Sequence, residues 1–215
     1  MLLIFNIFEL GIKEGEKNAY VAVGKNNITK SVLNDEGTLG MYLVQEKENP
    51  NMTYMFEVYE DEKSYQEHVK SEQYKEFLRQ SPTILTNHKK KIQVMPEYMG
   101  DKKFVQTRNT RVNYVTVDVK EGFNDAFREI VLDEMKQSIK KEEGVYVIYA
   151  ATAIGNPNKW YFFEIYENEK AYQKHRKTAH FKKYIEQTEN IIENKEFINI
   201  EGVKLLNKGN LNYVK

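Results

Sequence analysis

The chain carries the same segment twice. Residues 54–68 read YMFEVYEDEKSYQEH and residues 161–175 read YFFEIYENEKAYQKH, with ten of the fifteen positions identical. The same gap-free shift of 107 residues also pairs Asn6 with Asn113 and Glu36-Gly37 with Glu143-Gly144. This period is far longer than a solenoid repeat of roughly 20 to 50 residues and approaches the size of a small domain. We therefore predict two copies of one domain, over residues 1–106 and 107–215.

The composition argues against several classes of function. The 32 basic and 32 acidic residues cancel, so the chain lacks the net charge that attracts nucleic acid or anionic lipid. It has no cysteine, which excludes disulfides, thiolate metal sites and cysteine nucleophiles. The apolar N-terminus is too short to span a membrane and lacks the charge pattern of a signal peptide. We expect a cytoplasmic protein that binds neither nucleic acid nor a membrane.

Each copy opens with a predicted strand followed by a helix. Alternating β-favouring residues predict the strand over residues 3–8 in the first copy and 112–117 in the second. In the second copy the helix is predicted from apolar residues at helical spacing: Phe123, Ala126, Phe127, Ile130, Val131, Met135 and Ile139. The first copy has a weaker helical pattern, because Gly24 and the pair Asn26-Asn27 lower helix propensity.

A hairpin, a second helix and a final strand complete each copy. In the first copy, Asn49-Pro50-Asn51 supplies the turn of the hairpin. An acidic first turn then begins one helix that continues to Leu78, or to Ile185 in the second copy. The predicted strands are 39–45, 52–59 and 91–95 in the first copy and 146–153, 159–166 and 197–204 in the second. This β-α-β-β-α-β order is ferredoxin-like.

The string FEVYEDEKSYQEHVKSEQYKEF and its twin FEIYENEKAYQKHRKTAHFKKY resemble the signature region of the antibiotic biosynthesis monooxygenase family. There a strand ends in Glu-x-aromatic, an acidic turn follows, and a helix carries an aromatic residue and then a His. The resemblance implies an α+β fold, in which tandem ferredoxin-like repeats pair their antiparallel sheets into an α+β barrel. One chain would then form an intrachain pseudo-dimer, which either stays monomeric or dimerises further.

The resemblance leaves the reaction open, because members of this family differ in function. Some oxygenate polycyclic phenols or quinols without a metal or flavin, and others degrade haem. The haem-degrading branch combines an Asn on the first strand with a Trp and a haem-ligating His on the second helix. Here His68 and His175 occupy the Trp position, and Leu78 and Ile185 occupy the ligand position, which argues against haem ligation of that type.

Polar residues shared by both copies are the candidate site residues on the strands. Asn6 and Asn113 interrupt apolar strands, where an amide can bind a substrate carbonyl or phenolate, or satisfy a backbone group. Glu57 and Glu164 lie within aromatic strands, where a carboxylate must be paired or solvated. Each is therefore either part of an ion pair or a group that acts on substrate.

The shared histidines are the candidate proton acceptors. His68 and His175 follow Tyr65 and Tyr172 by three residues, so a helix places the His ring beside the Tyr ring. A His can take a proton from a phenol, or it can pack and hydrogen-bond to the glutamate of the neighbouring strand. His88 and His180 are not shared between the copies, and we predict that both are surface residues.

No linear motif indicates a metal or cofactor. The chain has no His-x-Glu or Glu-x-x-His ligand set and no glycine-rich phosphate loop, so we expect neither a metal nor another cofactor.

We predict a cofactor-independent monooxygenase that acts on a small phenolic or quinol-type aromatic with molecular oxygen. The expected catalytic residues are His68, His175, Asn6 and Asn113, and the expected substrate-binding residues are Tyr65, Tyr172, Glu57 and Glu164. Two alternatives remain: a non-catalytic small-molecule-binding or stress-response module of the same fold, and a haem-binding or haem-degrading protein.

Overall fold

The computed structural model describes residues 3–215, which include the whole of the predicted first strand. The described chain forms two compact units. The first comprises the chain as far as Val94 together with residues 104–106 and 200–209. The second comprises residues 95–103, 107–199 and 210–215. Each unit thus combines most of one repeat with a strand that follows the other repeat in the sequence.

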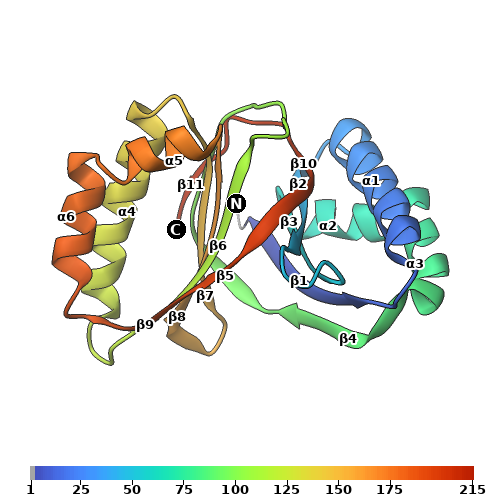
Figure 1. The fold of residues 1–215 in the computed structure, drawn as a ribbon, viewed down its shortest axis with the longest axis horizontal. Helices are drawn as coiled ribbons and strands as arrows, with labels where there is room; N and C mark the ends of the chain where they lie inside the picture. Colours follow the sequence, from blue (N-terminus) through green and yellow to red (C-terminus); the bar gives the residue numbers. More distant parts are fainter. Residues whose placement is uncertain (1–2) are drawn as a thin grey trace. The chain divides into compact units, whose positions relative to one another are not determined.

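The first unit has a five-stranded sheet with the strand order β10-β2-β3-β1-β4 (Figure 1). Its strands are β1 (Ile4–Ile12), β2 (Thr38–Glu46), β3 (Met52–Tyr59), β4 (Leu85–Ile92) and β10 (Ile200–Asn207), and its helices are α1 (Lys17–Asn34), α2 (Glu62–Val69) and α3 (Glu72–Ile84). The strand β10, drawn in red in Figure 1, pairs antiparallel with β2 although more than 150 residues separate them.

The second unit repeats this plan in a six-stranded sheet with the order β11-β5-β7-β8-β6-β9. Its strands are β5 (Val94–Asp101), β6 (Arg111–Val119), β7 (Val145–Ala153), β8 (Asn156–Tyr166), β9 (Ile192–Ile198) and β11 (Asn212–Val214), and its helices are α4 (Asn124–Lys141), α5 (Glu169–His175) and α6 (Ala179–Thr188). The structure confirms the α+β class and the tandem ferredoxin-like repeats.

The range predicted for the final strand of each copy was wrong. The ranges 91–95 and 197–204 each span the junction of two strands, between β4 and β5 and between β9 and β10. The chain leaves the edge strand of one sheet and continues directly into a strand of the other unit's sheet. A local pattern of β-favouring residues shows that a segment is extended, but it does not show which sheet the segment joins.

The predicted helix after the hairpin is in fact two helices in each copy. Ser71 begins α3 and Thr178 begins α6, because each side chain accepts a hydrogen bond from a backbone amide three residues later. Both capping residues have extended backbone, with ψ of 150° and 154°. The chain therefore changes direction between the helices, and this change positions the site described below.

The first helix forms despite the weak propensity of its sequence. The buried residues of α1 recur at three- and four-residue intervals: Tyr20, Val23, Gly24, Asn27, Ile28, Ser31 and Val32. Packing of this face against the sheet outweighs the low propensity of its glycine and asparagines. A Cβ at Gly24 would lie 3.2 Å from Leu43 of β2, so glycine lets the helix approach the sheet closely.

The hairpin turns differ between the two copies. Asn49-Pro50-Asn51 forms the predicted turn between β2 and β3. In the second copy the turn consists of Ile154 and Gly155 alone, and Gly155 has the positive φ of 84° that a tight hairpin turn requires. Residues 156–158, expected between the strands, instead belong to β8.

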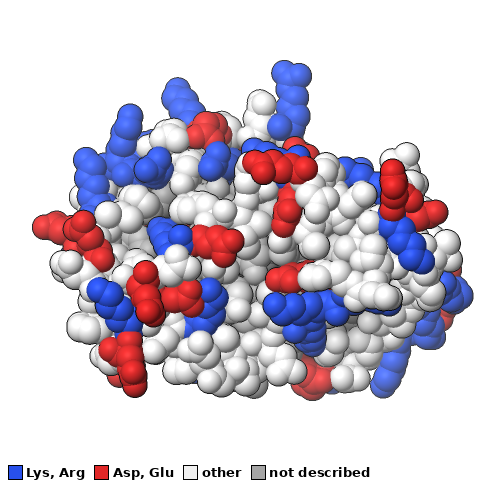
Figure 2. Space-filling view, turned by 60° about the horizontal axis from the view of Figure 1, so that its bottom comes forward, with Lys and Arg blue, Asp and Glu red and all other residues white. Residues whose placement is uncertain are grey.

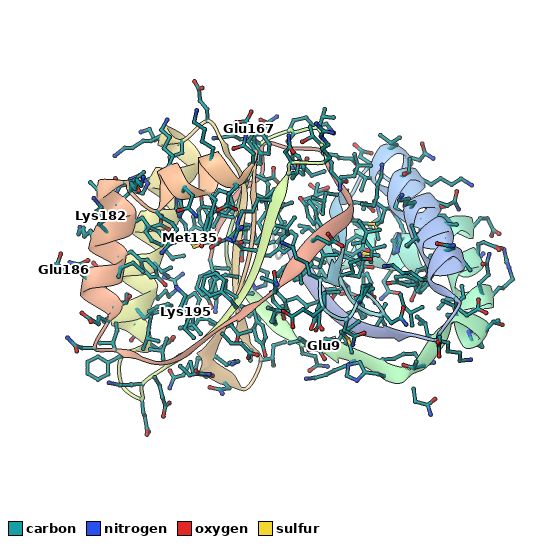
Figure 3. The ribbon with its side chains drawn as sticks, viewed as in Figure 1. Glu9, Met135, Glu167, Lys182, Glu186 and Lys195 are labelled. Atoms are coloured by element: carbon teal, nitrogen blue, oxygen red, sulfur yellow. The ribbon has the colours of Figure 1, made fainter. Side chains whose placement is uncertain are left out.

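In each unit the helices cover one face of the sheet and bury an apolar core there. In the second unit, Met135 points from α4 toward the sheet, whereas Lys182 and Glu186 point away from it on α6 (Figure 3). Acidic and basic side chains alternate over the face shown in Figure 2, in keeping with the zero net charge. Among residues 3–215, no helix combines the length and the apolar character needed to cross a membrane.

Candidate functional site

An asparagine, a glutamate and a tyrosine meet on the helix-covered face of each sheet. In the first unit, Asn6 of β1 lies directly opposite Glu57 of β3, and Tyr59 donates a 2.9 Å hydrogen bond to Glu57 Oε2. The second unit places Asn113, Glu164 and Tyr166 in the same register, with the same 2.9 Å bond. The two tyrosines were missed by the sequence analysis, although the repeat preserves them two residues after each glutamate.

Burial controls the charge of this group in the first unit. Glu57 is 6 % exposed, and its desolvation raises the pKa of the carboxyl from 4.5 to about 7, even though hydrogen bonding to Tyr59 opposes the shift. Asn6 is 3 % exposed, and hydrogen bonding from its amide to Glu57 also opposes the rise of the carboxyl pKa. The first unit therefore holds a carboxyl that titrates near neutral pH beside a buried amide.

His68 lies beside this group, at the end of α2. Its ring is fully buried between Tyr59 and Tyr74, with ring centres 5.3 and 5.0 Å away. The hydrogen-bond partner of Nδ1 is Ser31 Oγ at 3.2 Å, and not Glu57 as one reading of the sequence predicted. Burial lowers the pKa of His68 to about 4, so the ring is neutral at physiological pH. Its Nε2 has no hydrogen-bond partner in the described chain.

Tyr65 lies at the outer side of the same cluster. Its ring centre is 5.3 Å from that of Tyr59, and Lys91 Nζ lies 5.0 Å above the ring. Tyr172 is its counterpart in the second unit, and the guanidinium of Arg111 lies over the Tyr172 ring, 4.2 Å from the ring centre. All four residues predicted to act in the first unit are thus brought together: Asn6, Glu57, Tyr65 and His68.

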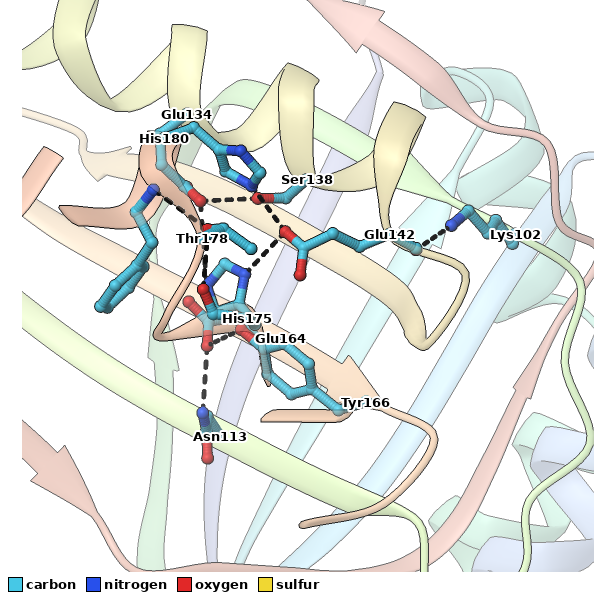
Figure 4. A network of polar contacts seen from close by, with 11 residues as sticks. Lys102, Asn113, Glu134, Ser138, Glu142, Glu164, Tyr166, His175, Thr178 and His180 are labelled. Carbon is cyan, nitrogen blue, oxygen red and sulfur yellow. Dashed lines mark hydrogen bonds and ion pairs between the residues drawn. The ribbon is translucent and has the colours of Figure 1, made fainter. Parts of the chain in front are cut away.

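In the second unit the corresponding polar atoms are engaged with one another (Figure 4). Asn113 Nδ2 donates to Glu164 Oε2 at 3.1 Å. His175 Nδ1 lies 3.0 Å from Glu142 Oε1, and His175 Nε2 lies 3.8 Å from Glu134 Oε1. Burial opposes protonation of His175, but these carboxylates outweigh it and raise the pKa of the ring.

The prediction that His180 lies on the surface was wrong. Its side chain is 8 % exposed, and Nε2 lies 2.6 Å from Glu142 Oε1. In an uninterrupted helix His180 would point about 140° away from His175, because residues follow one another at about 100°. The break capped by Thr178 brings the two rings back to within 6.4 Å. His88, in contrast, is exposed as predicted and lies beside Glu9.

Three polar residues were not predicted at all, two of them on the buried face of α4 and the third at its C-cap. Glu134, Ser138 and Glu142 recur at intervals of four residues, and Ser138 Oγ donates to Glu134 Oε1 at 2.6 Å. Burial raises the pKa of Glu134 to about 7, with His175 opposing the shift. A signal existed in the sequence, because the 107-residue shift maps these positions onto equally polar residues of the first copy: Asn27, Ser31 and Asp35.

The second unit also brings together a set of potential metal ligands. Glu134, His175 and His180 each offer one ligand atom within 4.8 Å of the others. The three residues come from three different helices, so no linear motif reveals them. The positions that correspond to a haem ligand, Leu78 and Ile185, are apolar and 46 % and 42 % exposed.

The family model described as antibiotic biosynthesis monooxygenase matches residues 3–80 and again residues 110–187. No curated protein matches the chain. A solved structure of a "putative monooxygenase" from Lactobacillus acidophilus is 28 % identical, covers 99 % of this chain and 100 % of its own, and superposes with a TM-score of 0.94.

A second "putative monooxygenase", from Fusobacterium nucleatum, is also 28 % identical, covers 100 % of this chain and 98 % of its own, and has a TM-score of 0.93. An anthrone oxidase-like protein is 10 % identical, covers 97 % of this chain and 94 % of its own, and has a TM-score of 0.57, a likeness of fold alone. The tandem organisation of the chain therefore recurs in proteins of closely similar structure.

Proposed function

Because the chain belongs to the antibiotic biosynthesis monooxygenase family, we propose that its first unit is a monooxygenase site for a small phenolic or quinol-type aromatic. The observation that carries this proposal is the difference between the two units. His68 Nε2 is buried without a hydrogen-bond partner in the described chain, whereas His175 Nε2 faces Glu134 Oε1 at 3.8 Å. Buried polar atoms are rarely left unpaired, so one that lies in the same cluster as a titrating carboxyl suits a ligand-binding site.

Glu57 is the better proton acceptor for such a substrate. A phenol has a pKa of about 10, so transfer to His68, with a pKa of about 4, is uphill by about 8 kcal/mol. Transfer to Glu57, with a pKa of about 7, is uphill by about 4 kcal/mol. We therefore assign the proton-accepting role to Glu57 in place of His68, and assign hydrogen bonding of the phenolate to Asn6 and His68.

The reaction needs no external reductant when the substrate supplies the electrons. A phenol with a free para carbon and one O2 give a quinone and one water. The para C–H bond and the phenolic O–H bond break, one oxygen atom becomes the new carbonyl, and the other leaves as water. The aromatic loses four electrons and O2 gains them. Deprotonation comes first, because the anion is the better electron donor, and oxygen chemistry without a cofactor depends on the substrate.

Oxygen uptake with a panel of phenols and quinols tests this function. The variant Asn6→Leu should lose at least about tenfold in kcat/KM, because it removes a hydrogen-bond donor to the developing anion. The matched variant Asn113→Leu, in the second unit, should retain the wild-type value within about twofold. Equal losses in both variants would contradict the assignment to the first unit.

The pH dependence identifies the base. Activity should rise with pH through about 7 as Glu57 ionises, and this rise should disappear in Glu57→Gln. Tight binding of the panel without any oxygen uptake would instead favour the non-catalytic binding module of the same fold.

A further inference from the structure

The second unit contains a cluster of two histidines and a glutamate that the proposed monooxygenase site does not use. Glu134 comes from α4, His175 from the end of α5 and His180 from the first turn of α6. Their side chains are only 7 %, 3 % and 8 % exposed, and their ligand atoms lie within 4.8 Å of one another. Two imidazoles and a carboxylate are a ligand set that first-row transition metals prefer.

Glu142 orients both rings from outside this set (Figure 4). Its Oε1 lies 3.0 Å from His175 Nδ1, so the Nε2 on the far side of the ring faces Glu134 Oε1 at 3.8 Å. The same Oε1 lies 2.6 Å from His180 Nε2. A carboxylate that holds one nitrogen of a histidine while the other faces outward is the usual support of a metal-ligating imidazole.

The spacing suits a small divalent ion after a modest closure. Zn²⁺ binds nitrogen and oxygen at about 2.0 to 2.2 Å, so the ligands of a tetrahedral site lie about 3.3 to 3.6 Å apart. The 3.8 Å between His175 Nε2 and Glu134 Oε1 is already close to this value. Ser138 holds the same Glu134 oxygen through a 2.6 Å hydrogen bond, which keeps the carboxylate turned toward the cluster.

A groove between α4 and α6 leads to the cluster. It has a volume of about 900 Å³, and its lining includes Glu134 and His180. Three further carboxylates and three basic residues also line the groove: Asp125, Glu129, Asp133, Arg128, Lys136 and Lys183. A metal ion therefore has a route from solvent to the buried ligands.

The first unit lacks this ligand set. The positions of Glu134, His175 and His180 correspond to Asn27, His68 and Gln73, so one imidazole and two neutral amides stand there. Gln73 Nε2 instead donates to Asp35 Oδ2 at 3.0 Å and to Ser31. Amide groups are poor ligands for zinc or iron, whose sites are built from Cys, His and carboxylates. The first unit therefore has the same fold but lacks two of the three proposed metal ligands.

We propose that the second unit binds one divalent transition-metal ion, with Zn²⁺ as the reference ion, through Glu134, His175 Nε2 and a ring nitrogen of His180. Glu142 is a positioning residue that holds the two imidazoles. The positive charge of the ion offsets the repulsion between the buried carboxylates of Glu134 and Glu142. This site lies outside the group around Asn6 and Glu57, so it does not depend on the proposed oxygenase activity.

Calorimetric titration of the chelator-treated, tag-free chain with Zn²⁺ tests the site. One equivalent of Zn²⁺ per chain should bind, with a dissociation constant of about 1 μM. His180→Gln, which installs the residue that the first unit carries, should weaken binding by at least about 100-fold. Glu142→Gln should weaken it by about 10- to 100-fold, the usual effect of removing a group that orients a ligand.

His88→Gln is the matched control, because His88 is exposed and remote from the cluster in sequence. It should bind Zn²⁺ with wild-type affinity. Zn²⁺ should also raise the melting temperature of the wild type and of His88→Gln, but not that of His180→Gln. Absence of binding at 100-fold higher Zn²⁺ concentration, or an affinity of a folded His180→Gln variant within tenfold of wild type, would overturn the proposal.

Discussion

Glu57 and His68 both contact Tyr59, and burial shifts both toward their neutral forms. The pKa of Glu57 rises to about 7 and that of His68 falls to about 4. The repeat predicted these residue types at these positions, since both belong to the duplicated segment. The degree of burial decides the charge of each group. That burial comes from aromatic rings on several strands and helices, and the sequence of any one element does not show that these rings meet.

The raised pKa of Glu57 makes stability depend on pH. The folded-state value of about 7 exceeds the reference value of 4.5, so its stabilising contribution is complete below pH 4.5 and is lost as pH rises through about 7. The difference corresponds to about 3 kcal/mol. Relative to wild type, Glu57→Gln should therefore gain up to about 3 kcal/mol between pH 4.5 and pH 8 in urea denaturation.

A matched substitution distinguishes this effect from a general change of charge. Glu48 is exposed, so Glu48→Gln should show no comparable change relative to wild type over the same pH range. A stability difference for Glu57→Gln that is constant from pH 4.5 to pH 8 would contradict the raised pKa.

At the scale of elements, the sequence predicted strands and helices but not the break within the second helical segment. Ser71 and Thr178 are good N-cap residues, yet they also occur inside helices, so the residue type alone did not reveal the break. The break matters for the site, because it turns Tyr74 back onto His68 and His180 back toward His175. These contacts appear only when the chain direction is known.

Loss of the cap at Ser71 should destabilise α3. Its side chain accepts from the amide of Tyr74, and an alanine there leaves that amide without its partner. Ser71→Ala should cost about 1 kcal/mol in urea denaturation. Ser81→Ala serves as the control, because its hydroxyl only donates to the carbonyl of Leu78 within the same helix. A cost for Ser71→Ala no greater than that for Ser81→Ala would contradict the capping role.

At the scale of the whole molecule, the two repeats exchange strands. β10 follows the second repeat but completes the sheet of the first unit, where Leu205 pairs with Tyr42. The proposed repeat boundaries at 1–106 and 107–215 describe the duplication in the sequence, while each compact unit uses residues from both. Neither unit is therefore complete with one repeat alone.

Deletion of residues 200–215 should expose the edge of β2. Amides of β2 that pair with β10 should then exchange with solvent at least about tenfold faster, because their ladder bonds are lost. Hydrogen exchange read by mass spectrometry over residues 41–46 measures this. The opposite edge of the sheet, β4, keeps its partner β1 and is the internal control. Unchanged exchange in β2 would contradict the strand exchange.

The sequence alone determined the duplication, the order of elements within a copy and the shared residues Asn6/Asn113, Glu57/Glu164 and His68/His175, because periodicity and identity are properties of the chain itself. Only the tertiary structure decided which sheet each final strand joins, which polar atoms stay unpaired, and that Glu134 meets His175 and His180. Hydrogen-bond partners and burial are set by residues far apart in the chain. Two copies that share the segment at residues 54–68 and 161–175 therefore hold chemically different sites, because residues outside that segment complete each one.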